Sequence, residues 1–223
     1  MRPVNIAVDG PSGVGKSSVC QKLAEEFQLS YLDTGGMYRA IALGMDELGI
    51  PPVSSDELKA ALPHLAVEQK GTRIYLNSSD VSDKIRTSRI SALASQYAGL
   101  PEVRAALVAV QQKIASETSC ILDGRDIGTV VLPDADVKLY LTASSKARAE
   151  RRYLQDKEAG RPADLAQIQK EIEERDYRDT HRAISPLHAA EDAIIVDTSD
   201  IDKEQTIALC SRLVKEKLQK GTL

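Results

Sequence analysis

The chain has 223 residues, 42% of them hydrophobic, and a formal net charge of -4. At ~150 residues per domain, this length fits one large domain, or one domain with a sizeable insertion, and the apolar content suffices for a core. These values exclude a disordered or fibrous protein. The negative charge argues against nucleic acid polymers and membranes as partners, because both are bound through surplus Lys and Arg.

The first fifty residues predict a strand, a loop, a helix, a second strand and a second helix. An apolar run over 4–8 is followed by a glycine-rich turn, and apolar residues then recur every four positions from Val19 to Phe27. That spacing is typical of a helix with one buried face. A brief apolar segment at 30–32 predicts the second strand, and residues 37–48 predict the second helix.

The pattern changes between about residues 56 and 115. A short helical segment leads to a stretch with alternating Ile74 and Leu76 between two turns, which predicts an antiparallel hairpin. Two further helices are expected on either side of a Gly-Leu-Pro break at 99–101. We interpret this block as an insertion with its own small sheet.

Short apolar strands return at 120–122, 137–141 and 194–196, separated by helical segments. Such strands are typical of a parallel sheet that is covered on both faces. Between them, residues 146–182 form a very polar helical hairpin interrupted by one Gly-Arg-Pro turn, and residues 202–220 predict an amphipathic C-terminal helix.

The cysteines give no sign of a metal or redox site. Cys20, Cys120 and Cys210 are odd in number and far apart, without a CxxC pair, so we expect buried, reduced thiols. The N-terminal apolar run is too short for a signal peptide, and no stretch approaches 18 apolar residues. A cytoplasmic protein is therefore expected.

Residues 10–17 read GPSGVGKS and match the phosphate-binding pattern G-x-x-x-x-G-K-[ST]. The match follows a predicted strand and opens a predicted helix, which disfavours a chance glycine-rich turn. In such a loop, backbone N–H groups surround the phosphates, Lys16 reaches the β and γ phosphates, and Ser17 helps to hold Mg²⁺. The expected ATP-binding residues are Gly10, Pro11, Ser12, Gly13, Val14, Gly15, Lys16, Ser17 and Ser18.

Asp123 directly follows the apolar strand at 120–122, where a carboxylate could act on the metal through its water ligands. Mg²⁺, bound by Ser17 and Asp123, is therefore the expected cofactor. The alternative is an ordinary aspartate at a strand end that starts a turn with Gly124.

The arginines are concentrated in one part of the chain. Eleven of the 15 lie between residues 86 and 182, and several lie in the polar hairpin. Phosphoryl transfer needs positive charge on the phosphate oxygens and exclusion of water, both of which a lid bearing arginines supplies. The alternative for any one of them is a solvated helix with ordinary i,i+4 ion pairs.

These segments resemble those of the bacterial cytidylate kinases, within the nucleoside monophosphate kinases, over essentially the whole chain. The segments that carry the resemblance are IAVDGPSGVGKSS (6–18), YLDTGGMYR (31–39), KIRTSRISALASQYAGLPEVR (84–104), DGRDIGTVVLPDADVKLYL (123–141) and ERDYRDTHRAISPL (174–187).

The resemblance implies an α/β fold: a P-loop core with a parallel five-stranded sheet flanked by helices, an inserted monophosphate-binding domain with a small antiparallel sheet, and a short helical lid. The expected ATP-binding core comprises 1–33, 116–147 and 183–223. The monophosphate-binding domain with its insertion spans 34–115, and the lid with its flanking helix spans 148–182.

The resemblance also implies roles for individual residues. Catalytic roles fall to Lys16, Arg125, Arg152 and Arg161. The CMP-binding residues would be Thr34, Arg39, Ser95, Arg104, Arg125, Asp126, Arg175, Asp179 and Arg182. Asp126 would accept from the cytosine amino group, although a structural ion pair with Arg125 is an alternative.

Tyr31, Tyr38 and Tyr97 are expected to be packing residues, and no metal role is expected for the histidines.

The predicted function is ATP-dependent phosphorylation of CMP and dCMP by a monomer. Two alternatives stay open: a kinase for UMP, AMP or dTMP, and a nonenzymatic nucleotide switch whose 84–182 region docks a partner.

Overall fold

The computed structural model describes residues 2–220, so residue 1 and residues 221–223 of the expected ATP-binding core lie outside the described residues. Its main element is the predicted five-stranded parallel sheet, and the strands lie in the order β2-β6-β1-β7-β8. The strands are β1 (Asn5–Asp9), β2 (Ser30–Asp33), β6 (Cys120–Gly124), β7 (Val137–Thr142) and β8 (Ile194–Asp197).

Side chains of the central strand alternate between two cores. Ile6 and Val8 point into one apolar cluster, whereas Ala7 belongs to the other. This alternation follows from the pleat, which directs successive side chains to opposite faces of a sheet. The short apolar strands of the sequence are therefore buried on both faces, as a parallel sheet requires.

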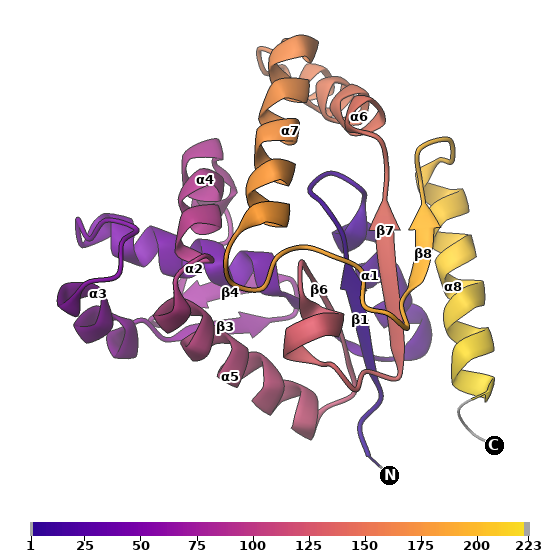
Figure 1. Cartoon of the computed structure of the whole chain (residues 1–223), viewed down its shortest axis with the longest axis horizontal. Helices are drawn as coiled ribbons and strands as arrows, with labels where there is room; N and C mark the ends of the chain where they lie inside the picture. Colours follow the sequence, from indigo (N-terminus) through magenta and orange to yellow (C-terminus); the bar gives the residue numbers. More distant parts are fainter. Residues whose placement is uncertain (1, 221–223) are drawn as a thin grey trace.

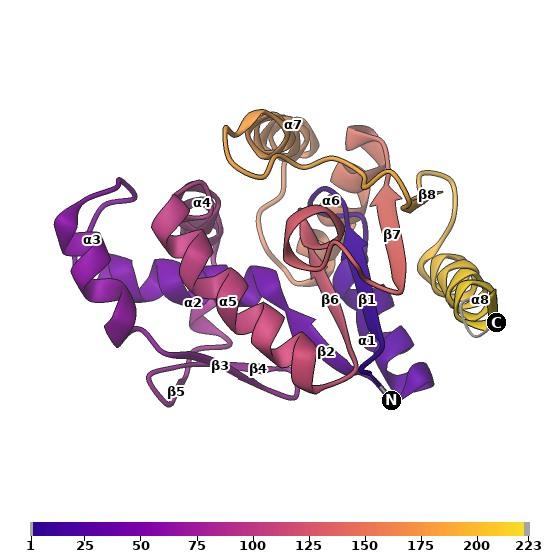
Figure 2. The ribbon, with the colours of Figure 1, turned by 60° about the horizontal axis from the view of Figure 1, so that its bottom comes forward.

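Helices cover both faces (Figures 1 and 2). The cluster that contains Ile6 is closed by α1 (Lys16–Phe27) and α8 (Lys203–Lys220). The opposite cluster includes side chains of α5 (Pro101–Glu117) and of η3 (Ile127–Val131). The sequence patterns predicted α1, α5 and α8, but not the single turn of η3.

The insertion follows β2 and carries the predicted antiparallel hairpin. Its small sheet has the order β3-β4-β5, and Gln69 on β3 pairs with Ile74 on β4. Figure 2 shows this sheet beneath α2 and beside the end of β2. The elements are α2 (Thr34–Glu47), α3 (Asp56–Ala61), η1 (Leu62–His64), β3 (Val67–Lys70), β4 (Arg73–Leu76), β5 (Ser79–Asp80), η2 (Lys84–Arg86) and α4 (Ser88–Tyr97).

The polar hairpin consists of α6 (Ser145–Glu158) and α7 (Leu165–His181), which lie together beyond the carboxyl ends of the strands (Figure 1). Ser144 and Asp164 cap these helices through their side chains. The cysteines are free, buried thiols, as predicted. No helix in the described part of the chain has the length and apolarity needed to cross a bilayer.

Gln111 on α5 offers a test of the core. It is fully buried, and neither its Nε2 nor its Oε1 has a hydrogen-bond partner among the described residues. Burial of an unsatisfied amide is unfavourable, so Gln111→Met should raise the free energy of unfolding by about 1–2 kcal/mol in denaturant titrations. Its neighbour Gln112 donates to the carbonyl of Val131 (3.0 Å), so Gln112→Met is the matched control and should not stabilise. A destabilised Gln111→Met variant would contradict the prediction.

Candidate active site

The phosphate-binding loop connects β1 to α1 at the carboxyl edge of the sheet. Gly10, Gly13 and Gly15 have φ values of 146°, 82° and 91°, which favour glycine. A Cβ on Gly10 would lie 2.1 Å from the carbonyl oxygen of Leu141 on β7. The first glycine is therefore required by close packing against a neighbouring strand as well as by its backbone conformation.

Lys16 begins α1 and is only 7% exposed. Its Nζ donates to the carbonyl oxygens of Gly10 (2.7 Å) and Pro11 (2.6 Å). Burial, reinforced by the nearby Arg125 charge, lowers the pKa of Lys16 to about 7. The loop thus holds an ammonium group where its positive charge is costly, and where an anion would stabilise that charge.

Asp123 at the end of β6 collects three contacts. Its carboxylate accepts from Ser17 Oγ (2.9 Å) and from the Tyr31 hydroxyl (3.1 Å), and Thr34 Oγ1 donates to its backbone carbonyl (2.6 Å). Burial, together with the nearby charge of Asp33, raises the pKa of Asp123 to about 6. Tyr31 was expected only to pack, but its hydroxyl contacts the carboxylate, because β2 pairs directly with β6.

Asp9 is the last residue of β1, and β1 pairs with the strand that ends beside Asp123. The sequence did not single out Asp9 as a site residue. Its carboxylate accepts from the backbone N–H groups of Ile127 (2.8 Å) and Gly128 (2.7 Å), the first residues of η3. Burial raises the pKa of Asp9 to about 6 despite these bonds. Asp9 thereby ties the loop that follows β6 to the central strand.

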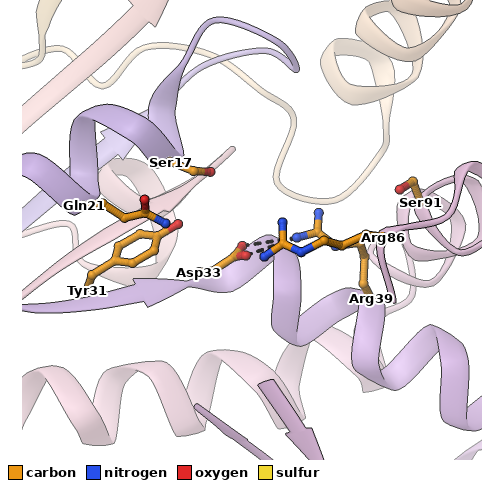
Figure 3. Close-up of a pocket in the computed structure, with 7 residues that line it drawn as sticks. All are labelled: Ser17, Gln21, Tyr31, Asp33, Arg39, Arg86 and Ser91. Atoms are coloured by element: carbon orange, nitrogen blue, oxygen red, sulfur yellow. Dashed lines mark hydrogen bonds and ion pairs between the residues drawn. The ribbon is translucent and has the colours of Figure 1, made fainter. Parts of the chain in front are cut away.

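A cavity of about 250 Å³ opens at this edge (Figure 3). Arg39 and Arg86 point into it from the insertion, and Arg39 Nη2 lies 3.1 Å from Asp33 Oδ2. Arg86 was missed as a candidate; its place in the KIRTSR segment, inside the arginine-rich region, was the only signal. The lining residues are Ser17, Gln21, Tyr31, Asp33, Arg39, Arg86 and Ser91.

Asp126 lies two residues after the end of β6. It is 5% exposed and lies between two arginines. It pairs with Arg104 of α5 and with Arg182 Nη2 (3.3 Å) just after α7. The alternative of an Arg125–Asp126 ion pair is wrong, because Arg125 Nε instead contacts Asp179 Oδ2 (2.8 Å). The two charges therefore have separate partners.

Arg175 on α7 lies close to these charges. Burial and the neighbouring Arg125 lower the pKa of Arg175 to about 10, and its Nε has no partner among the described residues. Ser95, half-buried on α4, lies one helical turn after Ser91, which lines the cavity. The positive charges of Arg125 and Arg175, which lie close together, fit a phosphorylated ligand.

The arginines of the hairpin divide into two groups. Arg148 is buried and bridges Asp176 of α7 (3.0 Å) and the Ser12 carbonyl (3.1 Å), so it connects the hairpin to the phosphate-binding loop. Arg151 contacts the Thr198 carbonyl. Arg152 and Arg161 are half-exposed, and both pair with Asp156, at 3.0 and 2.5 Å.

Fold and site together define a P-loop kinase that acts on a small molecule: a phosphate-binding loop, a buried strand-end carboxylate and a helical hairpin that carries arginines. The sequence model described as cytidylate kinase matches residues 6–216. The chain belongs to the cytidylate kinase family and is a phosphotransferase.

Comparison with individual proteins supports the same family. The chain is 41% identical to a cytidylate kinase of Streptococcus thermophilus, over 99% of this chain and 100% of that protein. It is 44% identical to that of Magnetococcus marinus, over 97% and 98%. A gluconokinase structure from Sinorhizobium meliloti, 14% identical over 99% and 98% of the two chains, has a TM-score of 0.51 and supports the fold alone.

The pKa of Asp123 leads to a stability prediction. In the folded chain it is about 6, above the usual 3.8, so the native state binds more protons between these pH values. The charged carboxylate therefore costs stability above pH ~6, and this cost disappears as the pH falls towards ~4. Asp123→Asn should be more stable than the wild type at pH 8, by on the order of 1–3 kcal/mol.

Urea titrations at pH 8 and pH 4.5 check this prediction, with Asp134→Asn at an exposed position as the matched control. The advantage of Asp123→Asn should shrink at the lower pH. A variant that is less stable at pH 8 would show that the carboxylate is favoured, not penalised, by its surroundings.

Proposed function

We propose that this chain transfers the γ-phosphoryl group of ATP to CMP and dCMP, which yields ADP and the corresponding diphosphate. The observation that carries the proposal is the buried carboxylate of Asp126, held by Arg104 and Arg182 at the sheet edge that bears the P-loop, in a member of the cytidylate kinase family.

The chemistry of cytosine agrees with this group. Cytosine N4 is a donor, whereas N3 and O2 are acceptors. Each carboxylate oxygen of Asp126 accepts one arginine N–H, which leaves acceptor capacity for an amino group. Arg104 and Arg182, assisted by Ser95, would donate to the ring acceptors. Uracil presents an oxygen at position 4, and this oxygen would face the carboxylate. The site would therefore discriminate against UMP by a factor of roughly 10⁴ or more.

Membership of the cytidylate kinase family suggests the residues for the other groups of the substrate. Arg39 and Arg125 would bind the acceptor phosphate, with Thr34 alongside. The hydroxyl hydrogen of Thr34 is already donated to the Asp123 carbonyl, so only its oxygen could interact. Asp179 and Arg175 would hold the ribose hydroxyls.

Residues 10–18 would bind the ATP phosphates, and Lys16 would leave the loop carbonyls for the β and γ phosphates. Ser17 Oγ and Asp123 Oδ2, 2.9 Å apart, are hard oxygen donors that suit Mg²⁺. Mg²⁺ would neutralise charge on the phosphates when bound; Ser17 would hold it directly and Asp123 through water.

Catalysis by this arrangement would consist of positioning and charge stabilisation. Lys16 and Arg125, together with Arg152 and Arg161 from the lid, would contact the phosphoryl group during an in-line displacement, while the lid excludes water. No covalent intermediate is required. Within the described part of the chain Arg152 bonds to Asp156 through Nε alone, so both of its terminal nitrogens would be available to the phosphoryl oxygens.

We further propose the functional division predicted from the sequence: an ATP-binding core (1–33, 116–147 and 183–223), a monophosphate-binding domain (34–115) and a lid with its flanking helix (148–182). The bounds of the insertion and of α6 and α7 support this division. Action as a monomer in the cytoplasm stays a prediction.

The function is tested by measuring ADP release with ATP and Mg²⁺ while CMP, dCMP, UMP, AMP and dTMP are offered in turn. CMP and dCMP should stimulate release, and the other three should stay near the rate with ATP alone. No stimulation by any monophosphate would favour a nucleotide switch over a kinase. Equal rates with UMP and CMP would refute the role of Asp126.

Arg104→Ala tests the acceptor site. Because the Arg104 guanidinium would contact the base directly, its loss should raise the KM for CMP by roughly tenfold or more, with less than a twofold change in the KM for ATP. The exposed Arg89, which pairs with Asp46 on the surface, offers Arg89→Ala as a control. Equal changes in both KM values would contradict this placement.

A further inference from the structure

Gln69, in the middle of β3, joins the small sheet of the insertion to the main sheet through its side chain. Its Nε2 donates to the carbonyl of Tyr31 (2.8 Å), and its Oε1 accepts from the N–H of Asp33 (2.9 Å). Nε2 also donates to the carbonyl of Gly71 in its own hairpin (2.8 Å). One amide thereby makes three hydrogen bonds, two of them to β2.

These two bonds have the pattern of a strand pairing. β2 is an edge of the five-stranded sheet, and Ser30 donates its N–H towards Ser119 on the β6 side. Because backbone groups alternate along a strand, Tyr31 and Asp33 direct theirs to the open edge. The amide of Gln69 therefore satisfies the groups that a sixth strand would have satisfied, at the point where the chain leaves β2 for α2.

The side chains of the two residues held by Gln69 reach the cavity of Figure 3. The Tyr31 hydroxyl contacts Asp123 (3.1 Å). Asp33 caps α2 through a bond from the N–H of Gly36 to Oδ1 (2.7 Å), and its Oδ2 lies 3.1 Å from Arg39 Nη2. Fixing the backbone of Asp33 therefore fixes the carboxylate that orients Arg39.

A second contact supports the same connection. A Cβ on Gly36 would lie 2.9 Å from Asp33 Oδ2 and 3.1 Å from Cγ1 of Ile74. Ile74 is the β4 partner of Gln69. The hairpin thus packs against the first turn of α2 from one side while Gln69 holds the residue that caps this turn.

We propose that Gln69 is a positioning residue for the acceptor phosphate. Its amide fixes the backbone of Asp33 relative to the hairpin, and the Asp33 carboxylate in turn orients the guanidinium of Arg39. The inference rests on the proposed function, in which Arg39 binds the phosphate of CMP. Gln69 itself is not among the residues that line the cavity.

The test compares Gln69→Met, which keeps the length of the side chain but removes the amide, with Glu68→Gln at the exposed neighbouring position. Loss of the bond to Asp33 should raise the KM for CMP by about fivefold, with less than a twofold change in the KM for ATP. Glu68→Gln should leave both values unchanged. Equal effects on both substrates, or none on CMP, would overturn the proposal.

A readout independent of activity is hydrogen exchange at the Asp33 amide. The wild type should protect this amide although it lies on an open sheet edge, and Gln69→Met should accelerate its exchange; rapid exchange in the wild type would refute the proposal even if the variant failed to fold. Arg39→Ala separates the two hypotheses. If it leaves the KM for CMP unchanged, the proposed phosphate site fails; if it raises that KM and Gln69→Met does not, only the role of Gln69 fails.

Discussion

Burial of charge at the carboxyl edge of the parallel sheet is the constraint on which this structure depends. Lys16, Asp9 and Asp123 are each at most 7% exposed, and burial is the largest cause of their shifted pKa values. Such groups are unfavourable unless they are paired or hydrogen-bonded. The surrounding loops supply these bonds: the P-loop carbonyls bind Lys16, and the first N–H groups of η3 bind Asp9.

The same constraint explains the arginine pairs. The pairs of Asp126 with Arg104 and Arg182, and of Arg125 with Asp179, bring together α5, the segment that follows β6 and the end of α7. Paired charges of this kind fix the relative positions of these elements, and charges that are positioned in advance lower the cost of organising a site during a reaction. Among the described residues the Nε of Arg175 has no hydrogen-bond partner, and the lowered pKa of Arg175 marks a place where an anion would be stabilising.

Much of the fold was predictable because its signals are local. The five parallel strands, the antiparallel hairpin and the long helices follow from short apolar runs and from spacing along the chain. The single turn of η3 was not predicted, since its first N–H groups bind Asp9, 118 positions away in the chain. The role of Tyr31 was missed for the same reason: its hydroxyl contacts a residue on a neighbouring strand.

The sequence by itself determined the phosphate-binding loop, the parallel sheet and the family, because these depend on residue types at fixed spacing. Only the tertiary structure decided which charges meet: Asp126 pairs with Arg104 and not with its neighbour Arg125, and Gln69 holds the end of β2. Pairings between distant segments depend on strand order and helix packing. Strand order and helix packing cannot be deduced from the spacing of residues along the chain, so these pairings could not be predicted from it.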